Sequence, residues 1–220
     1  MIKIKDYNKK EGKISFVTDM STSLANAIRR SLLEVPIMAI DEVEIAQNDS
    51  ALFDEILAHR LGLVPIKIER TIKETKFKLK EVGPKMVYST DLKPSVETGC
   101  KLPLTLLDNE QEIQLVAIAK IGRGIEHIKY SPGLMYYRHN VDKEIVNFVN
   151  VNENGKVSYN EKELKEKCNE DQAEKIKKLK EVNELLVSLE SWGQLEVKKM
   201  FTEAVDALDK NLTELSKAIK

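Results

Sequence analysis

The chain has 220 residues, and 42% of them are hydrophobic. This is enough length and apolar content for one or two domains with a buried core, and it excludes a disordered chain. The formal net charge is only −1, whereas a free-standing nucleic-acid-binding protein usually has a basic excess, so nucleic acid is not expected to be its main direct ligand.

The cysteines, Cys100 and Cys168, lie far apart, and the chain has three histidines and no CxxC motif. A structural zinc or iron–sulfur site takes about four grouped ligands, so we expect no metal, and few cysteines suit a reducing compartment. The N-terminal residues alternate apolar and polar side chains, which is unlike a signal peptide, and no run approaches the roughly 18 apolar residues of a membrane span. We therefore expect a cytoplasmic protein that does not bind membranes.

Residues 1–17 have the pattern of two strands joined by a turn near residues 8–12. Period two predicts one shared apolar face made of Ile2, Ile4, Ile14 and Phe16. The next stretch, STSLANAIRRSLLE (21–34), predicts a helix that is capped near Ser21 to Ser23 and ended by Pro36.

On a helical wheel the stretch 21–34 has one apolar face, which is expected to pack on the sheet. That face contains Leu24, Ala25, Ala27, Ile28, Leu32 and Val35. The opposite side holds Asn26, Arg29, Arg30 and Glu34, with Leu33 among them. Exposed single leucines are common, but a leucine beside arginines also suits the centre of a protein interface.

Residues 36–47 predict a strand, and residues 51–62 a second short helix that Gly62 ends in a left-handed conformation. The apolar face of this helix is made of Leu52, Phe53, Ile56 and Leu57. Arg60 falls within that face, where it either extends to solvent or hydrogen-bonds carbonyls at the helix end. Arginine is scarce in this lysine-rich chain, and it suits interfaces that need a planar, bidentate cation.

Residues 71–122 predict a meander of strands, which residues 130–139 continue after a turn at 131–133. Residues 150–183 are highly charged and poor in apolar side chains, so they predict a connector or a small solvated helical appendage. A further strand follows at 183–191.

The last helix, about 194–217, has the strongest periodicity in the chain. Its apolar residues recur with heptad-type spacing, at Phe201, Val205, Leu208, Leu212, Leu215 and Ile219, and Val197 extends them. Such a helix is about 36 Å long, which exceeds the thickness of a small domain. Burial in this chain's own core and pairing with a helix of another chain both remain open at this point.

Four stretches carry a family resemblance: LANAIRRSLLEVPIMAIDEVEI, LFDEILAHRLGLVPI, GRGIEHIKYSPG and LVSLESWGQLEVKKMFTEAVDAL. They resemble the D subunits of archaeal RNA polymerase, which are similar to the eukaryotic third-largest polymerase subunit and to the amino-terminal domain of the bacterial alpha subunit. The order of these stretches matches that family over most of the chain.

The resemblance implies an α+β fold in which a discontinuous dimerisation domain (1–45 and 184–220) receives an inserted, mainly antiparallel β domain (46–149). Residues 150–183 would be a charged appendage in the place where many family members have an iron–sulfur insertion. Because this region holds only Cys168, the cluster is not expected.

The resemblance also implies a non-catalytic subunit that forms a heterodimer with the small L subunit. The large catalytic subunits assemble on this heterodimer, the small N and P subunits lie nearby, and DNA is reached only through the complex. The predicted interface contains Leu24, Asn26, Ile28, Arg29, Arg30, Leu32, Leu33, His59, Arg60, Val197, Phe201, Val205, Leu208, Leu212 and Leu215.

Two alternatives belong to other functional classes. The first is a self-contained homodimeric interaction module. The second is a stand-alone enzyme with a cleft in the β domain, built from residues such as Glu126, His127 and Arg138. The lone GxG at 122–124 lacks the third glycine and the following helix of a phosphate-binding loop, so it predicts a turn or a β-bulge.

Overall fold

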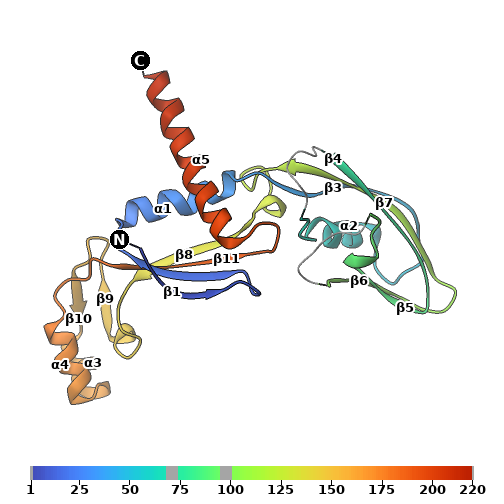
Figure 1. The fold of residues 1–220 in the computed structure, drawn as a ribbon. Coiled ribbons are helices and arrows are strands. Elements are labelled where there is room, and N and C mark those ends of the chain that lie inside the picture. The colour runs from blue at the N-terminus through green and yellow to red at the C-terminus, as the bar shows by residue number, and fades with distance from the viewer. Residues whose placement is uncertain (1, 68–73, 95–100, 220) are drawn as a thin grey trace.

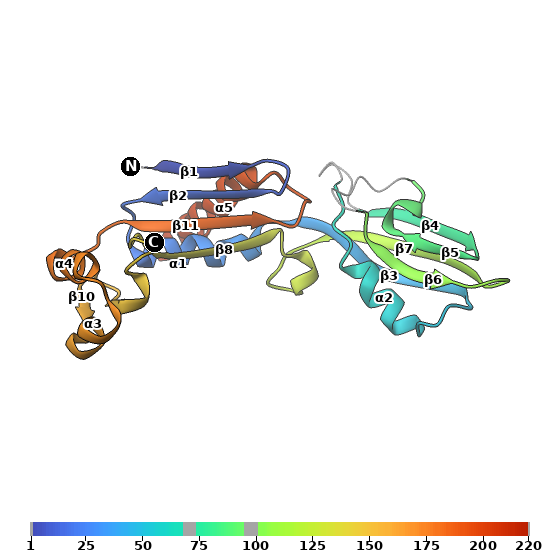
Figure 2. The ribbon, with the colours of Figure 1, turned by 90° about the horizontal axis from the view of Figure 1, so that it is seen from below.

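A computed structural model describes residues 2–67, 74–94 and 101–219. The molecule is elongated: a sheet with two helices lies in the middle, a second β domain at one end and a small appendage at the other (Figures 1 and 2). The antiparallel sheets and packed helices confirm the expected α+β class.

The central sheet has four antiparallel strands in the order β1-β2-β11-β8. Their bounds are Lys3–Asn8 for β1, Lys13–Thr18 for β2, Leu185–Ser191 for β11 and Gly133–His139 for β8. Val187 of β11 pairs with Phe16 of β2, so the sheet joins segments from both ends of the sequence. One sheet therefore contains strands from the first and the last part of the chain.

Two helices and a short 3-10 turn pack on the central sheet: α1 (Thr22–Ser31), η1 (Leu32–Glu34) and α5 (Val197–Ala218) (Figure 1). The Ser21 hydroxyl accepts a hydrogen bond from the backbone N–H of Leu24 at 3.2 Å and so caps α1 as predicted. Val35, which precedes Pro36, is extended and ends this helical segment.

In its described residues, the inserted domain contains a three-stranded antiparallel sheet, a two-stranded antiparallel sheet and one α-helix. These are β3 (Ile37–Asn48), β7 (Glu112–Gly122) and β4 (Glu74–Val82), then β5 (Lys85–Tyr88) with β6 (Pro103–Leu107), and α2 (Asp54–Gly62). Leu57 and Leu61 of α2 are fully buried against Phe77, Leu79 and Leu115 of the sheet, which fixes the helix on the domain.

The appendage has a small apolar core of its own and is more than a solvated connector. It contains η4 (Val146–Phe148), β9 (Val149–Val151), β10 (Val157–Tyr159), α3 (Glu161–Lys167) and α4 (Glu170–Lys178). Its buried side chains are Val141, Ile145, Val149, Leu164, Ile176 and Val182. Because residues before 150 complete this core, the predicted start of the appendage was too late.

Two predicted domain bounds also differ from the structure. The segment 133–139 was assigned to the inserted domain, but β8 pairs with β11 of the central sheet. β3 begins at Ile37 and contributes Met38 and Ile40 to the inserted domain's core, so this domain starts before residue 46. Strand partners are chosen over long sequence separations, which local patterns do not reveal.

Three local predictions were wrong. Ile2 and Ile4 are exposed on or beside the edge strand β1, although Ile14 and Phe16 are buried. Phe53 and Ile56 were assigned to a packed face but are exposed, because α2 turns Leu57 and Leu61 inward. Gly62 is the last helical residue and lacks a positive φ, since the helix passes into right-handed Leu63.

Candidate partner interface

The first half of α5 packs on the central sheet of its own chain. Val197, Met200 and Ala204 are 1%, 0% and 0% exposed. The ring of Phe201 meets that of Phe16 edge to face, with 5.4 Å between ring centroids. This half of the helix is therefore part of the domain core.

The second half of α5 leaves the body of the molecule, as Figure 1 shows. Leu212, Leu215 and Ile219 are 56%, 56% and 76% exposed, and Val205 is partly exposed. Leu208 lies between the two halves, half-buried against the core. We call Val205, Leu212, Leu215 and Ile219 the free stripe, since this chain leaves much of their apolar surface uncovered.

The start of α5 is tied to strand β1 by polar contacts. The Tyr7 hydroxyl donates a hydrogen bond to Glu196 Oε1 at 2.9 Å, and the Lys198 ammonium lies 4.3 Å from the centre of the Tyr7 ring. The hydrogen bond to Glu196 raises the pKa of the Tyr7 phenol above its ordinary value. These contacts hold the start of α5 beside the edge strand of the central sheet.

Helix α1 packs against α5 and presents polar side chains together with one exposed leucine, Leu24. Asn26 Oδ1 accepts hydrogen bonds from Nε and Nη2 of Arg29 at 3.2 and 2.9 Å, so these two side chains hold each other. Arg30 is exposed. Leu24, Asn26, Arg29 and Arg30 therefore remain available on the surface of the free chain.

Three predicted interface residues lie instead in the core of the central domain. Ile28, Leu32 and Val197 are at most 4% exposed in the chain alone, so they have almost no surface to offer a partner in this conformation. Heptad and wheel patterns identify an apolar face but do not distinguish burial within the chain from burial against a second one. The inner residues Met200 and Ala204 were missed, although their spacing from Val197 follows the helical period.

Leu33 is covered by the loop that follows β7. A Cβ atom added at Gly124 would lie 2.9 Å from Leu33 Cδ2, and the Ile125 N–H donates to the Leu33 carbonyl at 3.1 Å. The leucine among the arginines thus packs largely within its own chain. The GxG motif forms the end of β7 and the turn beyond it, as the sequence predicted.

His59 and Arg60 lie at the C-terminal end of α2, in the inserted domain. Arg60 Nη1 donates a hydrogen bond to the Leu104 carbonyl of β6 at 2.8 Å, so this arginine joins α2 to the neighbouring hairpin. The acceptor is therefore a carbonyl of another element and not one at the helix end. His59, on the same helix, is exposed, and Figure 1 shows α2 well apart from α5.

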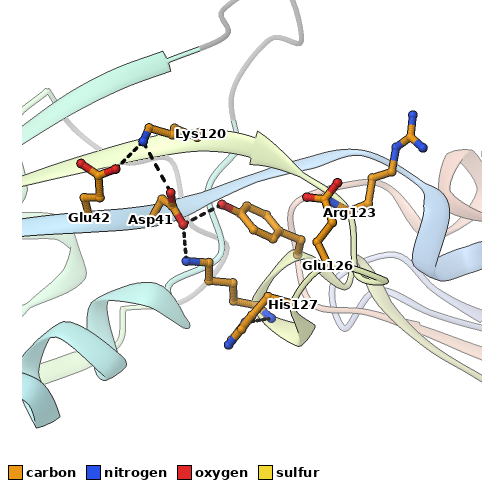
Figure 3. Close-up of polar contacts among 8 residues, drawn as sticks. Asp41, Glu42, Lys120, Arg123, Glu126 and His127 are labelled. Atoms are coloured by element: carbon orange, nitrogen blue, oxygen red, sulfur yellow. Dashed lines mark hydrogen bonds and ion pairs between the residues drawn. The ribbon is translucent and has the colours of Figure 1, made fainter.

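The residues of the alternative enzyme site do not converge. His127 Nδ1 accepts the backbone N–H of Lys129 at 3.1 Å, and Glu126 Oε2 lies 3.4 Å from the backbone N of Arg123. Figure 3 shows the side chains of Glu126 and His127 lying apart. Arg138 is on β8, where it donates to the Val141 carbonyl.

Within the described residues there is no group of three or more His, Cys, Asp or Glu side chains placed to hold a metal ion. Cys168 is half-buried against the small core of the appendage, and the appendage has no second thiol. A cysteine-ligated iron–sulfur cluster does not fit this donor set. No helix in the described part of the chain has the length and hydropathy to cross a bilayer.

The sequence also matches known proteins. Residues 16–212 match the family model of the RNA polymerase Rpb3/Rpb11 dimerisation domain. The chain is 42% identical over 155 residues to a Pyrococcus horikoshii protein, and this match covers 63% of the chain and 60% of the relative. It is 40% identical over 156 residues to a Methanocaldococcus jannaschii protein, and this match covers 68% of the chain and 82% of the relative.

A third relative, from Thermococcus kodakarensis, is 39% identical over an alignment of 155 residues, and the match covers 63% of this chain and 60% of the relative. All three relatives are named DNA-directed RNA polymerase subunit Rpo3. The match spans about three-fifths of the length of the Pyrococcus and Thermococcus proteins.

Proposed function

The chain belongs to the RNA polymerase Rpb3/Rpb11 dimerisation domain family, and from this premise we propose that it is an assembly subunit of an archaeal-type DNA-directed RNA polymerase. In this proposal the chain forms a heterodimer with the small L subunit. The large catalytic subunits assemble on the heterodimer, with the small N and P subunits nearby, and DNA is reached only through the complex. The setting is cytoplasmic.

The free stripe on α5 is the observation that carries the proposal. A soluble chain that extends half a helix from its body, with leucines about half exposed, leaves apolar surface that a second helix would bury. Leu24, Asn26, Arg29 and Arg30 of α1 would surround that contact with one apolar and three polar side chains. This arrangement resembles an interface with an apolar centre and a polar rim.

The proposed role is structural and not catalytic. Glu126 and His127 accept from two different backbone N–H groups of one loop and Arg138 lies on β8, so the three side chains support no convergent acid–base site. In this proposal the chain belongs to a nucleotidyltransferase complex and contributes binding surfaces to it. It holds no iron–sulfur cluster, because the appendage supplies a single thiol.

Co-expression with the L subunit of the same genome tests the proposal, with complex mass measured by light scattering or native mass spectrometry. We expect a one-to-one heterodimer. Leu215→Asp should abolish it, because burying an unpaired carboxylate costs several kcal/mol. Thr213→Asp is the matched control, since it places the same charge on an exposed position outside the free stripe.

The same mass measurement distinguishes the heterodimer from the homodimer alternative. A chain that forms a stable dimer by itself and ignores L would support the homodimeric module. A chain whose Leu215→Asp variant still pairs with L as tightly as the wild type would contradict the assignment of the free stripe. The unfolding midpoint of each variant alone shows whether the fold is intact.

A further inference from the structure

The inserted domain and the central domain meet where the chain passes from η1 into β3 and where β7 leads back toward the central domain. Asp41 of β3 lies at this meeting point (Figure 3). Its Oδ1 atom accepts a hydrogen bond from Lys129 Nζ at 2.6 Å and another from the Tyr130 hydroxyl at 3.1 Å. Lys120 of β7 lies 3.6 Å from Oδ2. One carboxylate thus joins the outgoing strand to the returning strand and to the segment after it.

Tyr130 links this carboxylate to the base of α5. Its side chain is only 6% exposed and packs against Ile37, Ala39 and Leu195. Leu195 also belongs to the core of the central domain and lies two residues before α5 begins. The ring fits because residue 122 is glycine: a Cβ atom there would lie 2.6 Å from the ring.

A second contact joins the same loop to the other helix of the central domain. Gly124 and Ile125 cover Leu33 of η1, the short turn that follows α1, and Ile125 donates its N–H to the Leu33 carbonyl. The loop 122–130 therefore contacts Leu33 just after α1 and Leu195 just before α5. Through Tyr130 and Lys129 it also reaches Asp41 in the inserted domain.

The charges at this point are partly shielded from water. The side chains of Lys129 and Asp41 are 16% and 33% exposed. The hydrogen bond from Lys129, supported by Tyr130 and Lys120, lowers the pKa of the Asp41 carboxyl below its ordinary value. Loss of the carboxylate would leave a largely buried ammonium group and a buried phenol without their acceptor, which is costly.

We propose that Asp41, with Lys129 and Tyr130, forms an interdomain joint that fixes the angle between the inserted domain and the α1–α5 helices. The joint holds the free stripe on α5 and the inserted domain in one fixed arrangement, so that the chain offers a single rigid platform. The role of the joint in an assembly platform rests on the proposed function, whereas the contacts that form the joint do not depend on it.

Distance distributions between two spin labels test this joint. Cysteines are introduced at Lys10, in the exposed turn between β1 and β2, and at Asn109, in the exposed turn between β6 and β7, after Cys100 and Cys168 are replaced by serine. The measurement is made on the full chain, alone and with L. A single narrow distance is expected for the parent protein.

Asp41→Asn should widen the distribution about twofold, because the inserted domain then samples several orientations. Tyr130→Phe keeps the ring and should widen it less, and Lys129→Met provides a further variant if one of the others does not fold. Glu42→Gln is the matched control: it changes the neighbouring carboxylate, which pairs with Lys120 and, among the described residues, makes no contact with Lys129 or Tyr130, so the width should stay unchanged.

Unchanged widths in Asp41→Asn, Tyr130→Phe and Lys129→Met, in folded protein, would overturn the joint. That result would leave the proposed function standing if the same variants still pair with L. Failure of all forms, the parent included, to pair with L would contradict the proposed function and would not affect the joint.

Discussion

The side-chain amide nitrogen of Asn211 lies 2.9 and 2.8 Å from the two carboxylate oxygens of Glu34, so one amide group bridges both. Asn211 is on α5 and Glu34 is on η1. Beyond Asn211, the described residues of α5 make hydrogen bonds and ion pairs only within the helix. This contact therefore marks the point at which α5 changes from a core helix into a free one.

Asn211→Ala should loosen this part of α5 without unfolding the domain. Loss of the bond to Glu34 is expected to lower the local stability by about 1 kcal/mol, which gives roughly fivefold faster amide exchange near residue 211. Exchange near Met200 and Ala204 should not change, because these side chains are fully buried. Hydrogen exchange with mass spectrometry measures both regions, and equal exchange near 211 in variant and parent would contradict the role of this contact.

The two halves of α5 should respond differently to truncation. Phe201→Ala removes the edge-to-face contact with Phe16 and opens space in the core, so the free energy of unfolding should fall by about 2–3 kcal/mol. Leu215→Ala removes an exposed side chain and should change it by less than about 0.5 kcal/mol. Denaturant unfolding of the chain alone measures both, and similar losses for the two variants would contradict the division of the helix.

Gly124→Ala should destabilise the chain because the added Cβ meets Leu33. The distances are 2.9 Å to Leu33 Cδ2 and 3.2 Å to Leu33 Cα, so the loop or η1 has to move, at a cost of about 1–3 kcal/mol. Leu33→Ala in the same chain should recover part of the loss, since it removes the closer atom. A double-mutant cycle on unfolding free energies measures this coupling.

Gly62→Ala is the matched glycine control. A Cβ there would lie 3.6 Å from the nearest atom, an ordinary contact, and the residue is helical. This variant should be neutral or more stable by up to about 1 kcal/mol, because alanine restricts the unfolded chain and favours helix. A loss similar to that of Gly124→Ala would contradict the steric explanation.

The interdomain joint should weaken in alkali. Burial, with the hydrogen bond to Asp41, raises the pKa of the Tyr130 phenol from 10.0 to about 12. A raised pKa means that the folded state holds this proton more tightly than the unfolded state does. The contribution of Tyr130 to the free energy of unfolding is therefore fully present below pH 10.0 and is lost as the pH rises toward about 12.

Tyr130→Phe has no phenol proton to lose, so the variant isolates this effect. Between pH 10.0 and about 12, the parent should lose about 2–3 kcal/mol more of its unfolding free energy than the variant does. Denaturant midpoints at several pH values measure the difference. Parallel decline of the two proteins would show that Tyr130 does not titrate in this way.

Much of the fold could be read from local patterns. The strands at 3–8, 13–18 and 185–191, the cap at Ser21 and the long last helix all follow from side-chain periodicity and turn residues. The candidate site could be predicted in part, because heptad spacing identified Leu212 and Leu215, which the structure leaves exposed. The same spacing also selected Val197, which lies in the core.

Contacts between distant segments could not be predicted in this way. Leu33 and Gly124 are neighbours only because β7 returns beside η1, and Asp41 meets Lys129 only because β3 and the loop after β7 share one end of the inserted domain. The wheel that placed Leu33 among arginines contained no information on that loop.

Sequence alone therefore determined the family, the kind of each main element and the presence of apolar faces, because these depend on residue order and on the helical and strand periods. Tertiary structure decided which face this chain covers for itself, which strand joins which sheet, and where α5 becomes free. The physical reason is that an apolar side chain is buried by whichever surface reaches it, and the folded path of the whole chain sets that surface.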